Sequence, residues 1–252
     1  METEGLTGEQ ISKEIEHVRT VAKKIHETVR IVFAPSKVDE SNISDVAQIY
    51  GRIGKADYDT VVIVESSPGE AEKKIPMSSH KIYTTSLGTV QVNDRLRNDF
   101  CDEDDDFFID DEAFTDDMSL FDQLKVLQCL LDEFSVLSIQ ITDEGSFIVK
   151  ELANALEEIL TSKNALIVIC CDLDPVLKDE YLKIWKLIQN NETATLMNYL
   201  NSDDFVPEGK GVLIAGLMVA NAWGLKLVIE SKPENKYLTA YAEMQKHAIL
   251  SS

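Results

Sequence analysis

Two uninterrupted apolar segments constrain the fold of this chain more than any other feature. Residues 60–65 (TVVIVE) and 165–171 (ALIVICC) are rich in valine, isoleucine and leucine, and they lack the polar alternation of a half-exposed strand. Such segments are typical of strands that are covered on both faces, as happens when helices pack on both sides of a parallel sheet. The two segments therefore predict an α/β fold.

Further helices and strands are expected to alternate around these two segments. Thr7 with Gln10 indicates a capping box, and apolar residues at steps of four and three predict an amphipathic helix within residues 1–29. That apolar stripe comprises Ile11, Ile15, Val18, Ala22, Ile25 and Val29. The other expected strands are 30–34, 136–141, 225–230 and 237–244, with two short strands in 81–92. The other expected helices are 44–53, 119–134, 147–160, 176–188, 193–200 and 210–223.

No internal repeat, low-complexity linker or shift in composition divides the chain. We therefore expect residues 1–252 to form a single domain, in which helices flank a largely parallel, mixed sheet. No segment has the long apolar run of a membrane helix, and the first residues lack the basic and apolar regions of a signal peptide. These observations predict a cytoplasmic protein.

The chain is strongly acidic, because 24 lysines and arginines stand against 45 aspartates and glutamates, a net charge of −21. A negative field repels phosphate backbones and anionic lipid headgroups, so we expect neither nucleic acid nor a membrane as a partner. Solubility is the simplest role of this charge, and a basic protein partner stays open. The oligomeric state does not follow from these residues.

Residues 102–117 concentrate the acidity, with 10 of 16 residues aspartate or glutamate. Like charges at this density oppose compaction, so we expect a solvated acidic loop. The segment lacks the ligand spacing of an EF-hand. Phe107, Phe108 and Phe114 lie within it, and they either attach the loop to the body of the protein or dock a basic partner.

Short motifs along the chain resemble those of one family. After a strand that ends at Pro35 come VVIVESS, IYTTSLGTVQVN, DDMSLFDQLKVLQ, EFSVLSIQI, ALIVICCDLD, GKGVLIAGLMVANAWG and YLTAYAEM. Their order and spacing, over residues 30–244, resemble the Memo family, whose prokaryotic members are labelled AmmeMemoRadiSam system protein B. That family is related to the class III extradiol dioxygenases. The resemblance implies their fold, and in open α/β sheets ligands collect at the C-terminal ends of the strands.

The metal-binding motifs of the family are changed in this chain. The family's Pro-His-Ala-Gly is PSKV here with Ser36, a second family histidine falls close to Ser67, and Glu-His-Ser-Leu-Glu becomes DMSLF with Met118. Its Ser-Ser-Asp-x-x-His becomes CCDLDP over residues 170–175, which keeps Asp172 and loses the histidine. Serine and methionine are poor ligands for a divalent transition metal, and proline offers none. We therefore expect no metal and no other cofactor, in a vestigial cleft lined by Ser36, Ser67, Met118, Cys170, Asp172 and Asp174.

Cys170 and Cys171 end an apolar strand, where neighbouring side chains point to opposite faces. A catalytic thiolate needs a base or a positive field nearby, whereas Asp172 and Asp174 raise the thiol pKa and no histidine partner is evident. We expect both cysteines to serve packing, and Asp172 to cap the loop or helix that follows it. No Cys spacing typical of a disulfide framework or a zinc site is present.

Two functions remain for a fold without its metal ligands. The first hypothesis is a non-catalytic Memo-like protein that serves as a binding or scaffold module. The alternative is a small-molecule enzyme whose cleft uses Ser36, Ser67, Cys170 or Asp172. An enzyme is expected to bring polar groups together around a titratable residue with a perturbed pKa, whereas a filled or apolar cleft favours the binding module.

Overall fold

The structure is a computed structural model that describes part of the chain in detail. The described residues are 6–21, 29–54, 58–67, 74–103, 105–112, 114, 118–172, 182–183, 186–187, 189–200, 209–230 and 239–244. Most of the expected helix 176–188 lies outside these residues.

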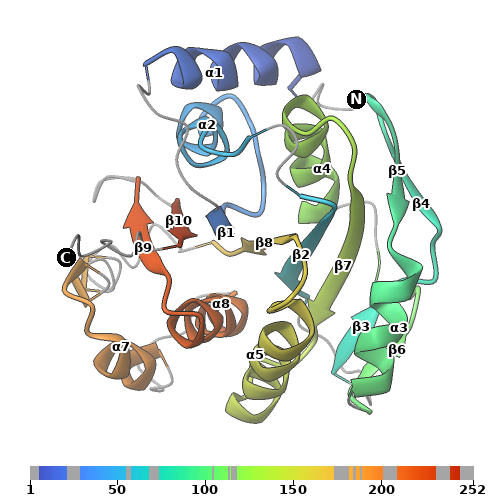
Figure 1. The fold of residues 1–252 in the computed structure, drawn as a ribbon, viewed down its shortest axis with the longest axis vertical. Coiled ribbons are helices and arrows are strands. Elements are labelled where there is room, and N and C mark those ends of the chain that lie inside the picture. The colour runs from blue at the N-terminus through green and yellow to red at the C-terminus, as the bar shows by residue number, and fades with distance from the viewer. Residues whose placement is uncertain are drawn as a thin grey trace, which may run out of the picture.

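The described residues form one sheet with helices on both of its faces (Figure 1). The strands are β1 Val29–Ala34, β2 Thr60–Ser66, β3 Ile75–Met77, β4 Ile82–Thr85, β5 Gly88–Val92, β6 Phe107–Ile109, β7 Ser135–Ile141, β8 Ala165–Cys170, β9 Lys226–Ile229 and β10 Ala240–Glu243. The helices are α1 Gly8–Val21, α2 Ile43–Tyr50, α3 Asp94–Glu103, α4 Ser119–Leu130, α5 Ser146–Leu160, α7 Thr193–Leu200 and α8 Lys210–Ala222.

The sheet is parallel in its centre and antiparallel toward its edges. Its order is β4-β5-β7-β2-β8-β1-β10-β9, while β3 pairs with β6 and β7. The contacts β5–β7, β7–β2, β2–β8 and β8–β1 are parallel, whereas β4–β5, β1–β10 and β10–β9 are antiparallel. Parallel central strands bring their C-terminal ends to one edge, which is where a doubly covered sheet binds ligands. The expected α/β fold with a largely parallel, mixed sheet is confirmed.

Each central strand contributes to two hydrophobic cores. On β2, Val61 and Ile63 pack in the core under α1, α2 and α4, while Val62 and Val64 pack in the core under α3, α5 and α8. Figure 1 shows these two layers of helices on opposite sides of the sheet. Because helices cover both faces of the sheet, a central strand has no solvent-facing side on which polar residues would be favoured. This explains why these segments are apolar without interruption. Of the described helices, none has the length and apolar character needed to span a bilayer.

The first helix begins as expected and ends earlier than its apolar stripe suggests. The backbone N–H of Thr7 donates to Gln10 Oε1 at 2.9 Å, and the Gln10 N–H donates to Thr7 Oγ1 at 3.3 Å, which confirms the capping box. Ile11, Ile15 and Val18 are buried. Assigning Val29 to the helical stripe is wrong, because Val29 is the first residue of β1 and pairs with Glu243 of β10; the stripe's other residues, Ala22 and Ile25, lie outside the described part.

The acidic segment 102–117 is more ordered than a solvated loop. Its first two residues end α3, and Phe107–Ile109 forms β6, which pairs in parallel with β3. Phe107 is 2% exposed, and its ring centroid lies 5.2 Å from that of Phe100. Burying an aromatic side chain stabilises a protein by several kcal/mol, roughly 1.5–3, which outweighs repulsion among exposed carboxylates. The loop prediction is therefore wrong for residues 102–103 and 107–109, and the buried Phe107 attaches the segment to the body of the protein.

Candidate functional site

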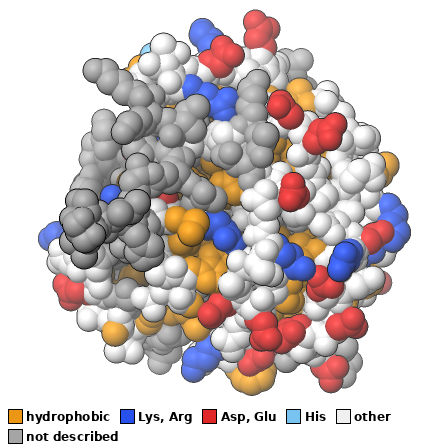
Figure 2. Space-filling view, viewed as in Figure 1, with side chains coloured by type: hydrophobic (Ala, Val, Ile, Leu, Met, Phe, Trp, Pro, Cys, Tyr) orange, Lys and Arg blue, Asp and Glu red, His pale blue; other side chains and the backbone are white. Residues whose placement is uncertain are grey.

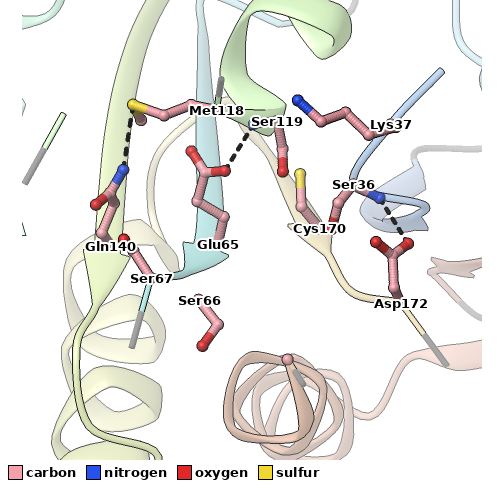
Figure 3. A pocket seen from close by; sticks show the side chains of 11 residues that line it. Ser36, Lys37, Glu65, Ser66, Ser67, Met118, Ser119, Gln140, Cys170 and Asp172 are labelled. Atoms are coloured by element: carbon pink, nitrogen blue, oxygen red, sulfur yellow. Dashed lines mark hydrogen bonds between the residues drawn. The ribbon is translucent and has the colours of Figure 1, made fainter. Parts of the chain in front are cut away.

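A pocket of ≈ 230 Å³ opens at the C-terminal edge of the central strands (Figure 3). It collects residues at or just after the ends of β1, β2, β7 and β8, residues at the start of α4, and Gly209, which directly precedes α8. The lining residues are Ser36, Lys37, Glu65, Ser66, Ser67, Met118, Ser119, Gln140, Cys170, Asp172 and Gly209. Five of the six expected cleft residues are thus brought together, and the sixth, Asp174, lies outside the described residues.

Hydrogen bonds fix the loop after β1 at the rim of this pocket. The backbone N–H of Ser36 donates to Asp172 Oδ1 at 2.9 Å, so Asp172 ties the end of β8 to the end of β1. Gln123 of α4 donates from Nε2 to the Pro35 carbonyl at 2.9 Å, and it accepts from the Tyr50 hydroxyl at 2.7 Å. These contacts hold the strand-end loop in place from both sides. Asp172 is a partner of the β1 loop, and residues 173–181, where a capped helix was expected, lie outside the described part.

Glu65 lies at the floor of the pocket, beneath the first turn of α4. Its Oε2 accepts the backbone N–H of Ser119 at 2.8 Å, which satisfies one of the free donors at the helix N-terminus. Its Oε1 is buried and has no hydrogen-bond partner in the protein. Burial raises the pKa of the Glu65 carboxyl, and hydrogen bonds from Ser119, Leu120 and Gln140 offset only part of this effect. The pocket therefore contains a carboxyl group that holds its proton more tightly than usual.

Glu65 is the middle residue of a polar row across three adjacent strands. In the parallel pairing, Glu65 is in register with Gln140 of β7 on one side and with Cys170 of β8 on the other. Residues in register on parallel strands share a face of the sheet, and for this row that face is the one covered by α4. Figure 3 shows the three side chains beneath Met118 and Ser119.

Gln140 and Ser66 bring further unsatisfied polar atoms to the pocket. Gln140 donates from Nε2 to Met118 Sδ at 3.3 Å, which is a weak acceptor, and its buried Oε1 has no partner. The Ser66 hydroxyl is also buried and has no partner in the protein. Buried polar groups without a partner are rare in folded proteins, so three at one pocket indicate groups placed for a ligand or for solvent.

Both strand-end cysteines are 1% exposed and lie on opposite faces of the sheet. Burial raises the pKa of the Cys170 thiol well above its usual value, and the carboxylates of Glu65 and Asp172 raise it further. Burial, together with Asp172 and Glu144, raises the pKa of the Cys171 thiol too. A thiol in such surroundings is a poor nucleophile, which agrees with the expected packing role.

The donor atoms in the pocket do not fit a transition metal. Its lining residues offer hydroxyls, one thioether, one amide, a thiol with a raised pKa and two carboxylates already engaged by the N–H groups of Ser36 and Ser119. No histidine is among them, and no three His, Cys, Asp or Glu side chains within the described ranges could hold a metal ion together. Imidazole and thiolate are the ligands that hold such metals firmly. The absence of a bound metal stays a prediction, tested below.

Lys37, Ser119 and Gln140 were not among the expected lining residues, whereas the strand end at Glu65 and Ser66 was one of the places where a ligand was expected. Glu65 and Gln140 are polar residues near the ends of strands that are otherwise almost wholly buried. A buried strand has no solvent-facing side to receive such a residue, so a polar residue near its C-terminal end indicates a pocket. Gly209 was also missed: it adopts φ 83°, a region that favours glycine, where α8 starts beside Cys171.

Comparison with known proteins agrees with this fold. Residues 7–242 match the model of the Memo-like protein family. A MEMO1 family protein of Thermotoga neapolitana is 26% identical over 167 residues, which cover 64% of this chain and 59% of that relative. The crystal structure of an uncharacterized protein from Escherichia coli K12 has a TM-score of 0.55 at 13% identity, covering 86% of this chain and 100% of that chain. The match to the relative spans less than two thirds of its length, and the likeness to the E. coli structure shows the fold alone. The family match covers nearly the whole chain, and the chain therefore belongs to the Memo-like protein family.

Proposed function

We propose that this Memo-like protein is a non-catalytic binding module that holds a small polar molecule in its strand-end pocket without a transition metal. The observation that carries the proposal is the pocket itself: it is open, ≈ 230 Å³ in volume, and lined by polar side chains whose donor set does not fit a metal. Drug-sized ligands occupy pockets of about 300–1,000 Å³, so the volume suits a smaller metabolite.

The pocket chemistry favours binding over catalysis. Nucleophilic catalysis needs an activated side chain, whereas burial and acidic neighbours raise the pKa of the Cys170 thiol. Asp172 already accepts the Ser36 N–H at 2.9 Å, and none of the described lining residues is a histidine. The remaining polar groups can orient and select a ligand.

The enzyme alternative is favoured by one observation, the raised pKa of Glu65 in an open pocket. A carboxyl with a raised pKa suits general acid–base catalysis near neutral pH. In such an enzyme Glu65 would exchange a proton with the substrate through its partnerless Oε1. Conversion of a bound ligand, lost on Glu65→Gln substitution while ligand binding persists, would establish this alternative over the binding module.

A metabolite screen in the presence of EDTA tests the binding proposal. We expect at least one small polar compound to raise the melting temperature of the purified protein, because a ligand that binds only the folded state stabilises it. Ser67→Phe is expected to abolish the shift, since its ring would fill part of the pocket. A shift that requires added iron, copper or zinc, or one that Ser67→Phe leaves intact, would contradict the proposal.

A basic protein partner is a separate part of this proposal, supported by the net charge of −21. In Figure 2, acidic side chains are scattered over the visible face with lysines and arginines between them. This mixed pattern does not by itself mark a docking surface on that face. Association with a basic partner would weaken steeply with salt, and affinity measurements at two ionic strengths test this dependence.

A further inference from the structure

The pocket floor carries a buried carboxyl group, and Lys37 is the one cationic side chain among the described lining residues. Glu65 is 5% exposed, and the groups that set its pKa are hydrogen-bond donors and burial, with no lysine or arginine among them. A buried carboxylate is costly unless a positive group or several hydrogen bonds compensate it. The donors that favour the ionised form are Ser119, Leu120 and Gln140; the Ser119 N–H lies 2.8 Å from Oε2, while Oε1 makes no well-aligned hydrogen bond in the protein.

The neighbouring unsatisfied atoms are acceptors too. Gln140 Oε1 accepts hydrogen bonds only, and the Ser66 hydroxyl accepts or donates. Gln140 is in register with Glu65 on the adjacent strand, while Ser66 follows Glu65 in the chain. A ligand that satisfies the Oε1 atoms of Glu65 and Gln140 therefore has to bring N–H or O–H donors, and a positive charge on that ligand would stabilise the ionised form of Glu65.

We propose that the strand-end pocket binds a small organic cation through a primary ammonium group, with Glu65 Oε1 as its anchor. An ammonium group carries N–H donors and one positive charge, which suit the partnerless Oε1 atoms of Glu65 and Gln140 on one face of the sheet. This inference rests on the proposed small-molecule function and names the ligand class for the same pocket.

Other ligand classes fit the pocket less well. A metal ion needs several anionic or imidazole ligands, and of the described lining residues only Glu65 and Asp172 carry carboxylates, each of which already accepts a backbone N–H. A neutral polyol would satisfy the acceptors and leave the Glu65 charge uncompensated. An anion would meet the carboxylates of both Glu65 and Asp172 in the same pocket, where Lys37 is the single cationic side chain among the described lining residues.

The titratable and charged groups around Glu65 set the expected pH dependence. Cys170 lies beside Glu65 on β8, and the charge of Glu65 contributes to the raised pKa of Tyr83 on β4. Lys37 and Asp172 line the same pocket. An ammonium ion binds the ionised carboxylate, so binding has to displace the proton of Glu65. We therefore expect the affinity for an amine to rise with pH through the titration of Glu65 and then to level off.

An isosteric series of probes tests the ligand class. Butylamine, 1-butanol and butyrate share an alkyl chain and differ in the sign of charge at one end. We expect titrations followed by backbone NMR to shift the amides of pocket residues with butylamine, and the affinity for 1-butanol or butyrate to be at least ~10-fold lower, equivalent to about 1.4 kcal/mol. The test compares the three probes with one another, so it does not require butylamine to bind tightly.

Two matched variants distinguish a specific contact with Glu65 from general electrostatic attraction to an acidic protein. Glu65→Gln and Glu16→Gln each remove one negative charge, but Glu16 is exposed on α1, away from the pocket. We expect Glu65→Gln to lower the affinity for butylamine at least ~10-fold and to remove its pH dependence, whereas Glu16→Gln changes the affinity less than ~2-fold. Circular dichroism checks that both variants fold. If Glu65→Gln does not fold, the pH dependence of the wild-type affinity for butylamine tests the proposal instead: an affinity that does not rise with pH would overturn it.

The outcomes distinguish the ligand class from the function on which it rests. Pocket shifts with 1-butanol or butyrate equal to those with butylamine, or an amine affinity that Glu65→Gln leaves unchanged, would overturn the ammonium proposal and keep the pocket as a binding site. If no probe shifts the pocket amides and the metabolite screen is also negative, both proposals fail. Equal losses in Glu65→Gln and Glu16→Gln would identify nonspecific attraction to an acidic protein and would also overturn the inference.

Discussion

Replacing Glu65 by glutamine is expected to stabilise the protein at neutral pH and to leave its stability unchanged in mild acid. The side chain is 5% exposed, with one oxygen bonded to the Ser119 N–H at 2.8 Å and the other without a partner. Glutamine has nearly the same shape and keeps an oxygen for that hydrogen bond, while it removes the charge that burial disfavours. The substitution therefore isolates the cost of the buried charge.

The sign of the pH dependence follows from the direction of the pKa shift. Burial raises the pKa of Glu65 in the folded protein above its value in the unfolded chain. The folded state keeps the proton longer, so wild-type stability falls as the pH rises from the unfolded pKa to the folded pKa. One group limits this slope to about 1.4 kcal/mol per pH unit.

The size of the effect follows from the missing partner. A buried polar group without a hydrogen bond costs about 1–3 kcal/mol, and more if it is charged. We therefore expect Glu65→Gln to be more stable than wild type by about 1–3 kcal/mol at pH 8 and to equal it below about pH 4, where the carboxyl is protonated in both states. Above the folded pKa the difference is expected to stay constant.

Urea denaturation across this pH range measures the difference directly. Fluorescence and circular dichroism give the free energy of unfolding at each pH, and Glu16→Gln serves as the control, since exposed substitutions change stability by about 0.5 kcal/mol or less. A Glu65→Gln variant that is less stable than wild type at pH 8 would refute the reasoning. The same holds for a stability difference that does not change with pH, because that would not originate in the titration of Glu65.

Three further predictions concern the cysteines, the metal and the acidic segment. Iodoacetamide is expected to modify Cys170 and Cys171 slowly in the native protein and quickly after denaturation, since both are 1% exposed and their pKa values are raised; native modification faster than that of a free cysteine would contradict the packing role. After dialysis against a chelator, elemental analysis is expected to find no stoichiometric transition metal, and about one iron, copper or zinc per chain would show otherwise. Phe107→Ala is expected to lower the free energy of unfolding by about 3–5 kcal/mol, because Phe107 is buried against Phe100; a loss below about 0.5 kcal/mol would indicate that this segment does not contribute to the core.

The sequence predicts the central sheet well because burial there depends on composition alone. The strands β2 and β8 lie within one residue of their expected bounds. A segment that is apolar on both sides is stable in water only when both sides are buried, as in the centre of a sheet covered by helices. The short elements were missed for the opposite reason. β3 has three residues, and α3 contains few apolar side chains, with Leu96 and Phe100 buried. Arg97 of α3 is also buried; besides a bond to Asp94 in the same helix, it donates to the carbonyls of Ser78 and His80, and these two tertiary contacts are encoded by no periodicity.

The location of the pocket was predictable, whereas its chemistry depends on strand register. The ends of parallel strands define an edge of the sheet, so Ser36, Ser67, Cys170 and Asp172 could be assigned to one cleft from topology. The pairing of Glu65 with its neighbours on β7 and β8 depends on which strands are adjacent and in what register, and the chain order does not reveal either.

The distinction between loop and strand residues has a consequence for binding. Ser36, Ser67 and Asp172 follow strand ends, whereas Glu65, Gln140 and Cys170 belong to the strands themselves. Side chains on paired strands are positioned more rigidly than those on loops, so the floor of the pocket is preorganised. Rigid acceptors lose little entropy when a ligand binds, and their geometry selects for ligands whose donors match it. The floor is therefore expected to determine which charge and donors a ligand carries, while the loop residues at the rim determine how long that ligand can be.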